Sequence, residues 1–247
     1  MHPILFKIGP LTIYTYGLFV AIGFVAATYI STYYARKENI DKEKILDLSI
    51  YIFIGSLVGA RLLYVLVEFK QYIERPLDIF KVWEGGLVFY GGLIGGLIIF
   101  FWYVKKYNFK VWKIIDIFTL GLVLGQGIGR IGCFFSGCCY GIKSNKFGVI
   151  FSNLKDEIPH IPTQIIESIG LFIIFTILIN TKKKLDGEIF IKYIFYYGSF
   201  RFLIEFIRGD SRGPLLFSLI SISQFVSIVL IIIAIFLFKK LKEKSGN

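Results

Sequence analysis

Charged side chains are scarce in this chain. Asp, Glu, Lys and Arg make up 18% of its 247 residues, whereas a soluble domain carries about a quarter. No polar stretch is long enough to fold as a domain of its own, which excludes a single membrane anchor attached to a catalytic domain. The same composition excludes a soluble globular enzyme, a disordered chain and a fibrous repeat.

Cysteine and histidine are also few. The three cysteines, Cys133, Cys138 and Cys139, lie close together in the sequence, and their odd number and tight spacing do not indicate a disulfide scaffold. The two histidines, His2 and His160, are distant from them in sequence. Internal repeats, low-complexity tracts and linkers are lacking. The first residues lack the basic segment and cleavage site of a signal peptide, so we expect them to be mature sequence.

Apolar sequence is abundant. Hydrophobic residues make up 55% of the chain and aromatic residues 18%, and the mean hydropathy is +0.69. They fall in blocks of about twenty, the length that a helix needs to cross a hydrocarbon core of about 30 Å. The pattern predicts an all-α, polytopic membrane protein with a single integral-membrane domain over residues 1–247 and about seven transmembrane helices. The expected spans are Leu11–Tyr34, Asp47–Phe69, Leu87–Val104, Ile114–Phe135, Gln164–Asn180, Glu188–Ile207 and Leu216–Phe238.

The distribution of Lys and Arg predicts how these spans are oriented. Loops and ends on one side carry fifteen of them, and those on the other side carry nine. Because basic residues are enriched in cytoplasmic loops, we expect the N-terminus outside and the C-terminus in the cytoplasm. The longer connections, residues 70–86 and 137–163, then lie outside, and a site opening toward the outer leaflet is expected. The net charge of +11 comes mostly from short basic loops between the apolar blocks, which set the topology and attract anionic lipid headgroups. Nucleic acid is therefore not an expected partner.

Several ionisable side chains lie inside the expected spans. A charge within a membrane is costly, so each of these residues is expected to have a partner or a function. Arg61 lies in the second span, Arg130 closes the fourth, and Glu167 lies early in the fifth. The sixth span holds Arg201 and Glu205. These residues are the candidates for a buried polar site.

The sixth span carries a continuous polar stripe. In YYGSFRFLIEFIRGD, Tyr197, Arg201, Glu205 and Arg208 are spaced so that they share one helical face. Two interpretations are open, an ion-pair ladder that fixes packing and a site for an anion. The anion site is favoured because the deep arginines outnumber the nearby acids. Guanidinium also offers a permanent charge and a planar pair of donors that suit phosphate.

Glycines form a second pattern. Gly91 and Gly95 of the third span lie four residues apart, and the fourth span repeats this spacing. Small residues at this spacing let helix backbones approach closely in lipid, which explains most of them. The further glycines around Arg130 predict a bent or broken helix whose freed amides line a polar cavity. The hydroxyl of Tyr90, which lies between the glycine pairs, could reach such a cavity.

Four segments together resemble a known family. VFYGGLIGG, GQGIGRIGCF, PTQIIES and YYGSFRFLIEFIR, in this order, resemble prolipoprotein diacylglyceryl transferases, and the resemblance covers nearly the whole chain. It implies a multi-pass transferase of the bacterial cytoplasmic (inner) membrane that works without a cofactor. Such an enzyme moves the diacylglyceryl group of phosphatidylglycerol to the thiol of the lipobox cysteine in a preprolipoprotein signal peptide. The product is a thioether, and glycerol phosphate leaves.

The resemblance also implies roles for residues. Arg130 and Arg201 would bind the phosphate of phosphatidylglycerol and neutralise the negative charge that builds on the leaving group. Tyr90 takes the place of a histidine that is often proposed as the base, and would stand near the reacting carbon. Further motif positions would shape the lipid-binding cavity: Tyr16, Tyr197, Glu205 and Arg208.

The chain departs from the family pattern at three positions. A phenol such as that of Tyr90, with an ordinary pKa of about 10, is a weaker base at neutral pH than imidazole unless nearby arginines lower its pKa. Cys133 and Cys138 stand where the pattern has asparagine and glutamate. A second hypothesis is therefore a non-catalytic phospholipid-binding membrane protein of the same fold. An unrelated small-anion transporter is a third, for which an inverted repeat would be expected.

The cysteines themselves allow three interpretations. They could pack as small residues, form a disulfide from Cys133 to Cys138 or Cys139, or bind a metal. Tetrahedral zinc needs four ligands, and both histidines are distant in sequence, so small-residue packing is favoured and no metal is expected.

Overall fold

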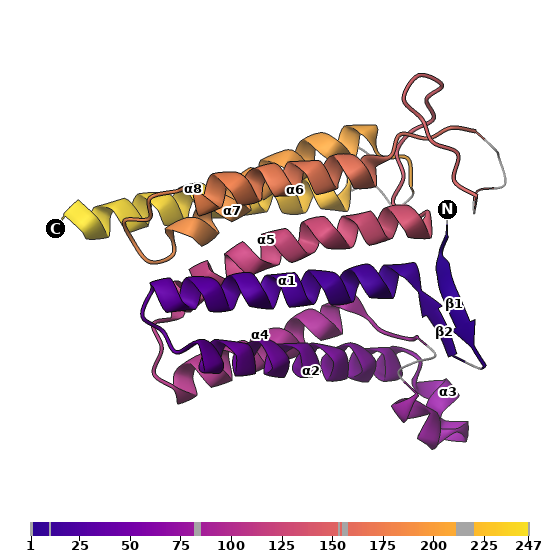
Figure 1. The fold of residues 1–247 in the computed structure, drawn as a ribbon, viewed down its shortest axis with the longest axis horizontal. Coiled ribbons are helices and arrows are strands. Elements are labelled where there is room, and N and C mark those ends of the chain that lie inside the picture. The colour runs from indigo at the N-terminus through magenta and orange to yellow at the C-terminus, as the bar shows by residue number, and fades with distance from the viewer. Residues whose placement is uncertain are drawn as a thin grey trace. The chain divides into compact units, whose positions relative to one another are not determined.

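The computed structural model describes residues 2–9, 11–81, 85–152, 154, 158–210 and 220–246 (Figure 1). The chain separates into two compact units, one formed by residues 1–31 with 115–247 and the other by residues 32–114. Each unit is described by itself below. That residues 1–247 act as a single domain stays a prediction.

Helices make up most of the described chain. The long ones are α1 (Thr15–Lys37), α2 (Lys42–Val67), α4 (Phe89–Lys106), α5 (Val111–Ser136), α6 (Thr163–Ile179), α7 (Glu188–Ile204) and α8 (Ile222–Gly246). Among the described residues, α1, α2, α5 and α8 are long and apolar enough to cross a membrane, and α6 is a shorter apolar helix. The prediction of a mostly helical membrane protein is confirmed. The number of spans and their direction stay predictions.

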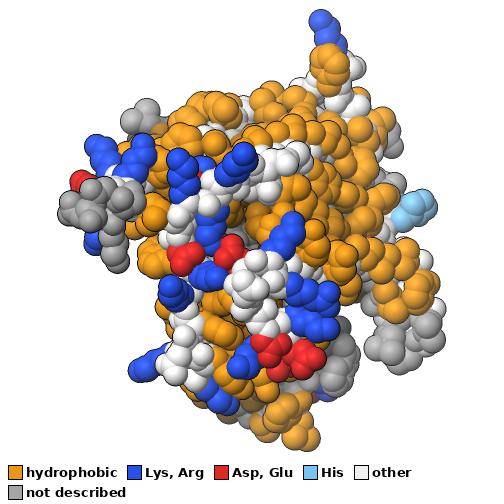
Figure 2. Space-filling view, turned by 60° about the vertical axis from the view of Figure 1, so that its left-hand side comes forward, with side chains coloured by type: hydrophobic (Ala, Val, Ile, Leu, Met, Phe, Trp, Pro, Cys, Tyr) orange, Lys and Arg blue, Asp and Glu red, His pale blue; other side chains and the backbone are white. Residues whose placement is uncertain are grey.

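The helix surfaces are those of a protein that lies in lipid. Large apolar side chains are exposed along the helices, among them Val25, Leu66 and Ile98, each more than 60% exposed. In Figure 2, Lys and Arg side chains lie in groups on a surface that is otherwise mainly hydrophobic. Soluble monomers rarely expose apolar patches of this extent to water. These helix surfaces are therefore suited to contact with membrane hydrocarbon.

The two ends of the chain differ from the expected spans. Residues before Thr15 form an antiparallel hairpin of β1 (Ile4–Ile8) and β2 (Leu11–Tyr14), with Gly9 at a φ of 56° in the turn. The expected start of the first span at Leu11, and the strictly all-α fold, are therefore wrong here, because hydropathy does not distinguish a short apolar strand from a helical turn. The expected start of the last span at Leu216 lies outside the described residues, and α8 begins at Ile222.

Short elements connect the long helices. In the unit of residues 32–114, α3 (Phe69–Glu74) and a 3-10 helix, η1 (Pro76–Phe80), follow α2. In the other unit, α7 continues directly into a 3-10 turn, η3 (Glu205–Ile207). The segment after α5 folds back in isolated bridges, one of which pairs Gly141 with Arg208.

Glycine contacts bring helix backbones together in both units. A Cβ atom on Gly91 of α4 would lie 2.3 Å from the carbonyl oxygen of Gly59 on α2, and one on Gly95 would lie 2.3 Å from that of Gly55. Likewise, a Cβ atom on Gly125 of α5 would lie 2.9 Å from the carbonyl oxygen of Gly23 on α1. The prediction that four-residue glycine spacing allows close helix approach is confirmed at these pairs.

The fourth span is not broken. α5 runs without interruption from Val111 through Arg130 to Ser136, so the predicted break with freed amides is wrong. Gly127 faces Phe172 of α6, and Gly132 faces α1, which shows that these glycines make room for neighbours. The helix ends at Gly137, whose φ of 69° favours glycine.

Candidate functional site: an arginine cluster on one carboxylate

One buried carboxylate brings three arginines together. Glu167, on α6, is 2% exposed. Its Oε2 lies 2.8 Å from Nε of Arg130, and its Oε1 lies 2.7 Å from Nη1 of Arg208 and 3.8 Å from Nη1 of Arg201. We call Glu167, Arg130, Arg201 and Arg208 the arginine cluster.

Packing among three helices positions the arginine cluster. Its members come from α5, α6, α7 and the segment that follows η3. The hydroxyl of Ser168 on α6 donates to the carbonyl of Gly127 on α5 at 2.8 Å. The hydroxyl of Tyr193 on α7 donates to the side-chain oxygen of Gln126 on α5 at 2.9 Å. These polar contacts between helices hold the charged side chains in a defined arrangement.

Arg130 and Arg201 keep donors that the cluster does not use. Arg130 is held through Nε alone, and in the described part of the chain its two terminal nitrogens make no hydrogen bond or ion pair. Its side chain is 16% exposed. Nη2 of Arg201 contacts Glu205 at 2.7 Å and Ser223 at 3.2 Å, whereas its Nη1 has no hydrogen-bond partner among the described residues. Both guanidinium groups therefore keep at least one nitrogen that makes no hydrogen bond among the described residues.

Arg208 is fully engaged. Its Nε and Nη2 donate to the two carboxylate oxygens of Asp210 at 2.9 and 2.8 Å, and its Nη1 donates to Glu167 at 2.7 Å. Burial lowers the pKa of the Arg208 guanidinium, but the charge of Asp210, a side-chain hydrogen bond with Cys139 and the charge of Glu167 together raise the pKa above its ordinary value. Arg208 is therefore a charged anchor for Glu167, with few donors left for a ligand.

The charges of the cluster are closer to balance than the sequence indicates. Each arginine lies within ion-pair distance of at least one of Glu167, Glu205 and Asp210. Within the arginine cluster and its ion-pair partners, the expected excess of arginines over acids is therefore not found among the described residues. The ion pairs of the ladder interpretation are present and fix each guanidinium, whereas an anion site at the remaining nitrogens of Arg130 and Arg201 stays a prediction.

The two candidate tyrosines of this unit lie on the helices that carry the cluster. Tyr16 lies in the first turn of α1 and packs against Gly132, which follows Arg130 by two residues on α5. A Cβ atom on Gly132 would lie 3.4 Å from the Cα atom of Tyr16. Tyr197 stacks on Tyr193 with ring centroids 5.6 Å apart, one turn before Arg201. Both are placed to border the cluster with aromatic surface.

Tyr90 belongs to the other unit. It lies in the first turn of α4, is 66% exposed, and meets the ring of Phe89 edge-on at 5.7 Å. No hydrogen bond to its hydroxyl is present among the described residues. Its nearness to a substrate stays a prediction.

Arg61 has a structural task. Its guanidinium donates to the backbone carbonyls of Ile79 and Gly85 at 2.8 Å each, of Gly86 at 3.2 Å and of Asp78 at 2.5 Å. These bonds hold the connection between α2 and α4 at one wall of a polar cavity of about 380 Å³. All three of its nitrogens are thereby occupied, so this deep charge is satisfied by the fold.

Sequence reasoning missed three contacts of the site. Glu167 stands out in the sequence by its depth, yet nothing there shows that three arginines converge on it. Asp210 follows Arg208 by two residues, and this spacing is the signal that could have indicated the local pair. Gln126, one turn before Arg130 on α5, gives a similar signal for the contact with α7.

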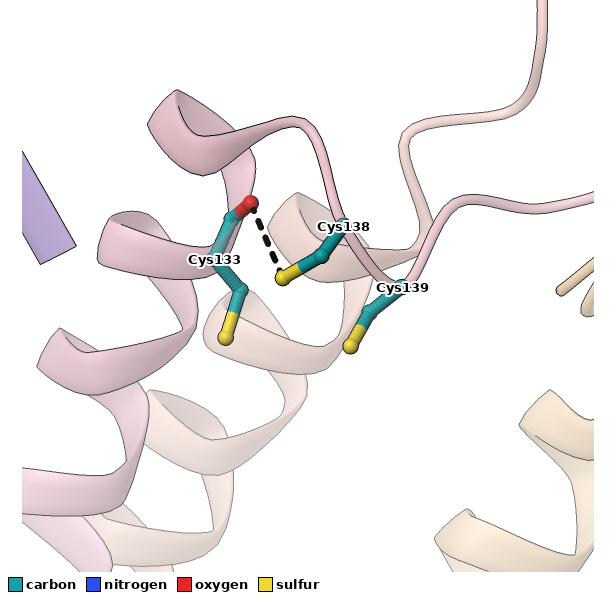
Figure 3. Close-up of side chains that lie close together, drawn as sticks. All are labelled: Cys133, Cys138 and Cys139. Atoms are coloured by element: carbon teal, nitrogen blue, oxygen red, sulfur yellow. Dashed lines mark hydrogen bonds between the residues drawn. The ribbon is translucent and has the colours of Figure 1, made fainter. Parts of the chain in front are cut away.

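The three cysteines lie next to this site and close to one another. Cys133 ends the helical turn that begins at Arg130, and Cys138 and Cys139 follow the turn at Gly137. None of the three forms a disulfide with a described residue, and their Sγ atoms lie within 4.8 Å of one another (Figure 3). The close approach of all three sulfurs is more than small-residue packing requires.

Known proteins resemble this chain along its whole length. The family model for prolipoprotein diacylglyceryl transferase matches residues 3–239. The phosphatidylglycerol–prolipoprotein diacylglyceryl transferase of Clostridium tetani is 40% identical over 96% of this chain and 97% of its own. Phosphatidylglycerol–prolipoprotein diacylglyceryl transferase 2 of Clostridium perfringens and the enzyme of Streptococcus equi subsp. zooepidemicus are each 34% identical over 99% of this chain and 97% of their own. The chain belongs to the prolipoprotein diacylglyceryl transferase family and is a membrane transferase.

Proposed function

We propose that this protein transfers the diacylglyceryl group of phosphatidylglycerol to the thiol of the lipobox cysteine in preprolipoproteins. The relatives at 34–40% identity are named for phosphatidylglycerol and prolipoprotein, and they match the chain almost from end to end. We further propose that the reaction takes place at the outer leaflet of the bacterial cytoplasmic membrane, with the N-terminus outside. The excess of basic residues in the opposite loops supports this orientation.

The free donors of Arg130 and Arg201 carry the proposal. Phosphatidylglycerol presents a phosphate with one negative charge, which a guanidinium can bind through two parallel hydrogen bonds. Arg130 is held by Glu167 at Nε, which leaves its two terminal nitrogens for a ligand. The ion pair therefore orients this group in advance for a ligand, which lowers the reorganisation needed when charge develops.

The bonds that form and break in the transfer reaction show where the charges of Arg130 and Arg201 would act. The thiol loses its proton to a base, and its sulfur attacks the glyceryl carbon that bears the phosphate ester. The sulfur–carbon bond forms as the carbon–oxygen bond breaks, and the oxygen leaves with the bonding electrons as part of glycerol phosphate. Arg130 and Arg201 stabilise the charge that gathers on that phosphate. Tyr90 would stand near the reacting carbon as the base, in place of the family's histidine.

The remaining candidate residues would support this step from around the cluster. Glu205 contacts Arg201, Arg208 anchors Glu167, and the rings of Tyr16 and Tyr197 would line the path of the lipid. We assign Arg208 a positioning role because its donors are occupied. Direct contact with lipid is then left to Arg130, Arg201 and the two tyrosines.

Arg201→Ala tests the phosphate assignment. A strain whose lipoprotein modification depends on this copy would express the variant, and lipidation of a reporter preprolipoprotein would be followed by its shift in mass. We expect lipidation to be lost. Lys192→Ala is the matched control, because Lys192 is a paired cation on the same helix, 2.7 Å from Glu188. Full lipidation with Arg201→Ala would contradict the assignment.

A further inference from the structure

The Sγ atoms of Cys133, Cys138 and Cys139 face one another at the end of α5 (Figure 3). All lie within 4.8 Å of one another, and these are the only cysteines in the sequence. Two come from one tight turn and the third from the helix before it. The group, which we call the thiol triad, has no part in the proposed transfer reaction.

The backbone that carries the thiol triad is pinned. The hydroxyl of Thr163 donates to the carbonyl of Cys139 at 2.7 Å, and the side-chain nitrogen of Gln164 donates to that of Cys138 at 2.5 Å. Both donors are fully buried at the start of α6. The amide of Cys138 also donates to the carbonyl of Cys133 at 3.2 Å. The backbone positions of the three cysteines are thus set by the fold, and rotation of their side chains remains to adjust the sulfurs.

The turn itself favours convergence of the sulfurs. Gly137 and Cys139 have φ angles of 69° and 66°, in the left-handed region that a cysteine rarely adopts. A conformation of this kind persists only where the surrounding structure holds it. Here it reverses the chain after α5, so that the thiols of Cys138 and Cys139 point back toward Cys133 (Figure 3).

The spacing of the triad suits a small soft cation. A metal–sulfur distance of about 2.3 Å places three sulfurs of a planar trigonal site about 4 Å apart. The observed limit of 4.8 Å is within about 1 Å of that value, which rotation of the side chains can supply. Among the described residues, no histidine or carboxylate joins the three sulfurs as a further ligand.

We propose that the thiol triad of Cys133, Cys138 and Cys139 is a binding site for a soft d10 cation, and that its three-sulfur ligand set selects Cu(I). Thiolates prefer soft cations, and a structural zinc site would need a fourth protein ligand. Binding converts three thiols and one Cu(I) ion into a three-coordinate complex. Three protons pass to water and no electrons are transferred. The inference does not rest on the proposed transferase reaction.

Copper titration of the full-length protein tests the proposal. Protein purified in detergent without added thiol, under anaerobic conditions, would be titrated with Cu(I) against a chromophoric Cu(I) chelator. We expect one ion per chain and, by X-ray absorption, a first shell of three sulfurs. This shell is measured on the unsubstituted protein, so the result does not depend on the folding of any variant.

Cysteine variants assign the ligands. Cys133→Ser, Cys138→Ser and Cys139→Ser should each weaken Cu(I) binding by more than the roughly 10–100-fold that loss of a ligand's hydrogen-bonding partner costs. Ser136→Ala, on the last turn of α5, is the matched control and should bind as the unsubstituted protein does. A two-sulfur shell, or one cysteine whose replacement has no effect, would overturn the three-thiolate site.

Two further results would also contradict the proposal. A thiol count of one in the purified protein would show a disulfide among the three cysteines. Tighter binding of Zn(II) than of Cu(I), measured by competition, would show a zinc site completed by water. A count of three thiols with preference for Cu(I) supports the inference.

Discussion

Replacement of Glu167 by glutamine separates the structural role of the arginine cluster from its proposed role in lipid binding. The variant keeps the shape of the side chain and removes its charge. Arg201 and Arg208 retain Glu205 and Asp210 as partners, whereas Arg130 loses the one acid with which it pairs in the described chain. Breaking a buried ion pair costs about 3–5 kcal/mol. We expect the lower end, because the side chain of Arg130 is 16% exposed.

The expected loss can be measured as a change in thermal unfolding. For a chain of this length, 1 kcal/mol corresponds to a shift in Tm of roughly 2–4 °C. A loss of about 3 kcal/mol therefore predicts that Glu167→Gln lowers the Tm by roughly 6–12 °C. Asp78→Asn is the control, since Asp78 pairs with Lys81 at the surface, where the two side chains are 29% and 39% exposed, and such an exposed pair contributes little to stability.

Arg130→Gln should reduce lipidation strongly and lower the Tm only slightly. Glu167 keeps Arg208 at 2.7 Å, so the Tm should fall by less than in Glu167→Gln. Lipidation should fall sharply, because two hydrogen bonds to a charged phosphate contribute roughly 1.5–3 kcal/mol each. Their loss from the transition state lowers the rate roughly 10²- to 10⁴-fold. An unchanged Tm in Glu167→Gln, or full lipidation in Arg130→Gln, would refute this division of roles.

Two other predictions concern the unit of residues 32–114. Lipidation should be lost with Tyr90→Phe and kept with Tyr90→His if the phenol acts as the base, and full activity of the Phe variant would exclude that role. Gly91→Ala places a Cβ atom 2.3 Å from the carbonyl oxygen of Gly59, so the Tm should fall by the equivalent of about 1–3 kcal/mol. Gly17→Ala, where nothing lies within 4 Å, should leave the Tm nearly unchanged, and equal shifts in the two variants would contradict the close packing of α2 and α4.

Sequence patterns predict the helices well where hydropathy and length suffice. The apolar blocks correspond to α1, α2, α4, α5, α6, α7 and α8, because twenty consecutive apolar residues leave a helix as the conformation that satisfies the backbone in lipid. Hydropathy does not show whether a short apolar run pairs as strands, so the hairpin before Thr15 was missed. Nor does it show whether a glycine breaks a helix or admits a neighbour, as Gly127 and Gly132 do.

The sequence predicts which residues form the candidate site but not which of them contact one another across helices. Tyr197 and Arg201 share α7 as helical spacing predicts, and the contact of Arg201 with Glu205 is an i, i+4 pair. The prediction that Arg208 continues the same helical stripe is wrong, because the helix ends before it and its backbone is extended. The convergence of α5 and α7 on Glu167 depends on tertiary packing, which one sequence does not encode in any local pattern. The approach of the three cysteines likewise depends on the left-handed turn after α5.

Transfer in a defined membrane tests the central claim most directly. The purified protein would be placed in vesicles containing phosphatidylglycerol, together with a synthetic lipobox peptide, and the peptide would be analysed by mass spectrometry. We predict that the peptide gains one diacylglyceryl group on its cysteine sulfur and that glycerol phosphate is released in equal amount. Binding of phosphatidylglycerol with no modified peptide would contradict the account and would identify the protein as a phospholipid-binding relative that has lost the reaction.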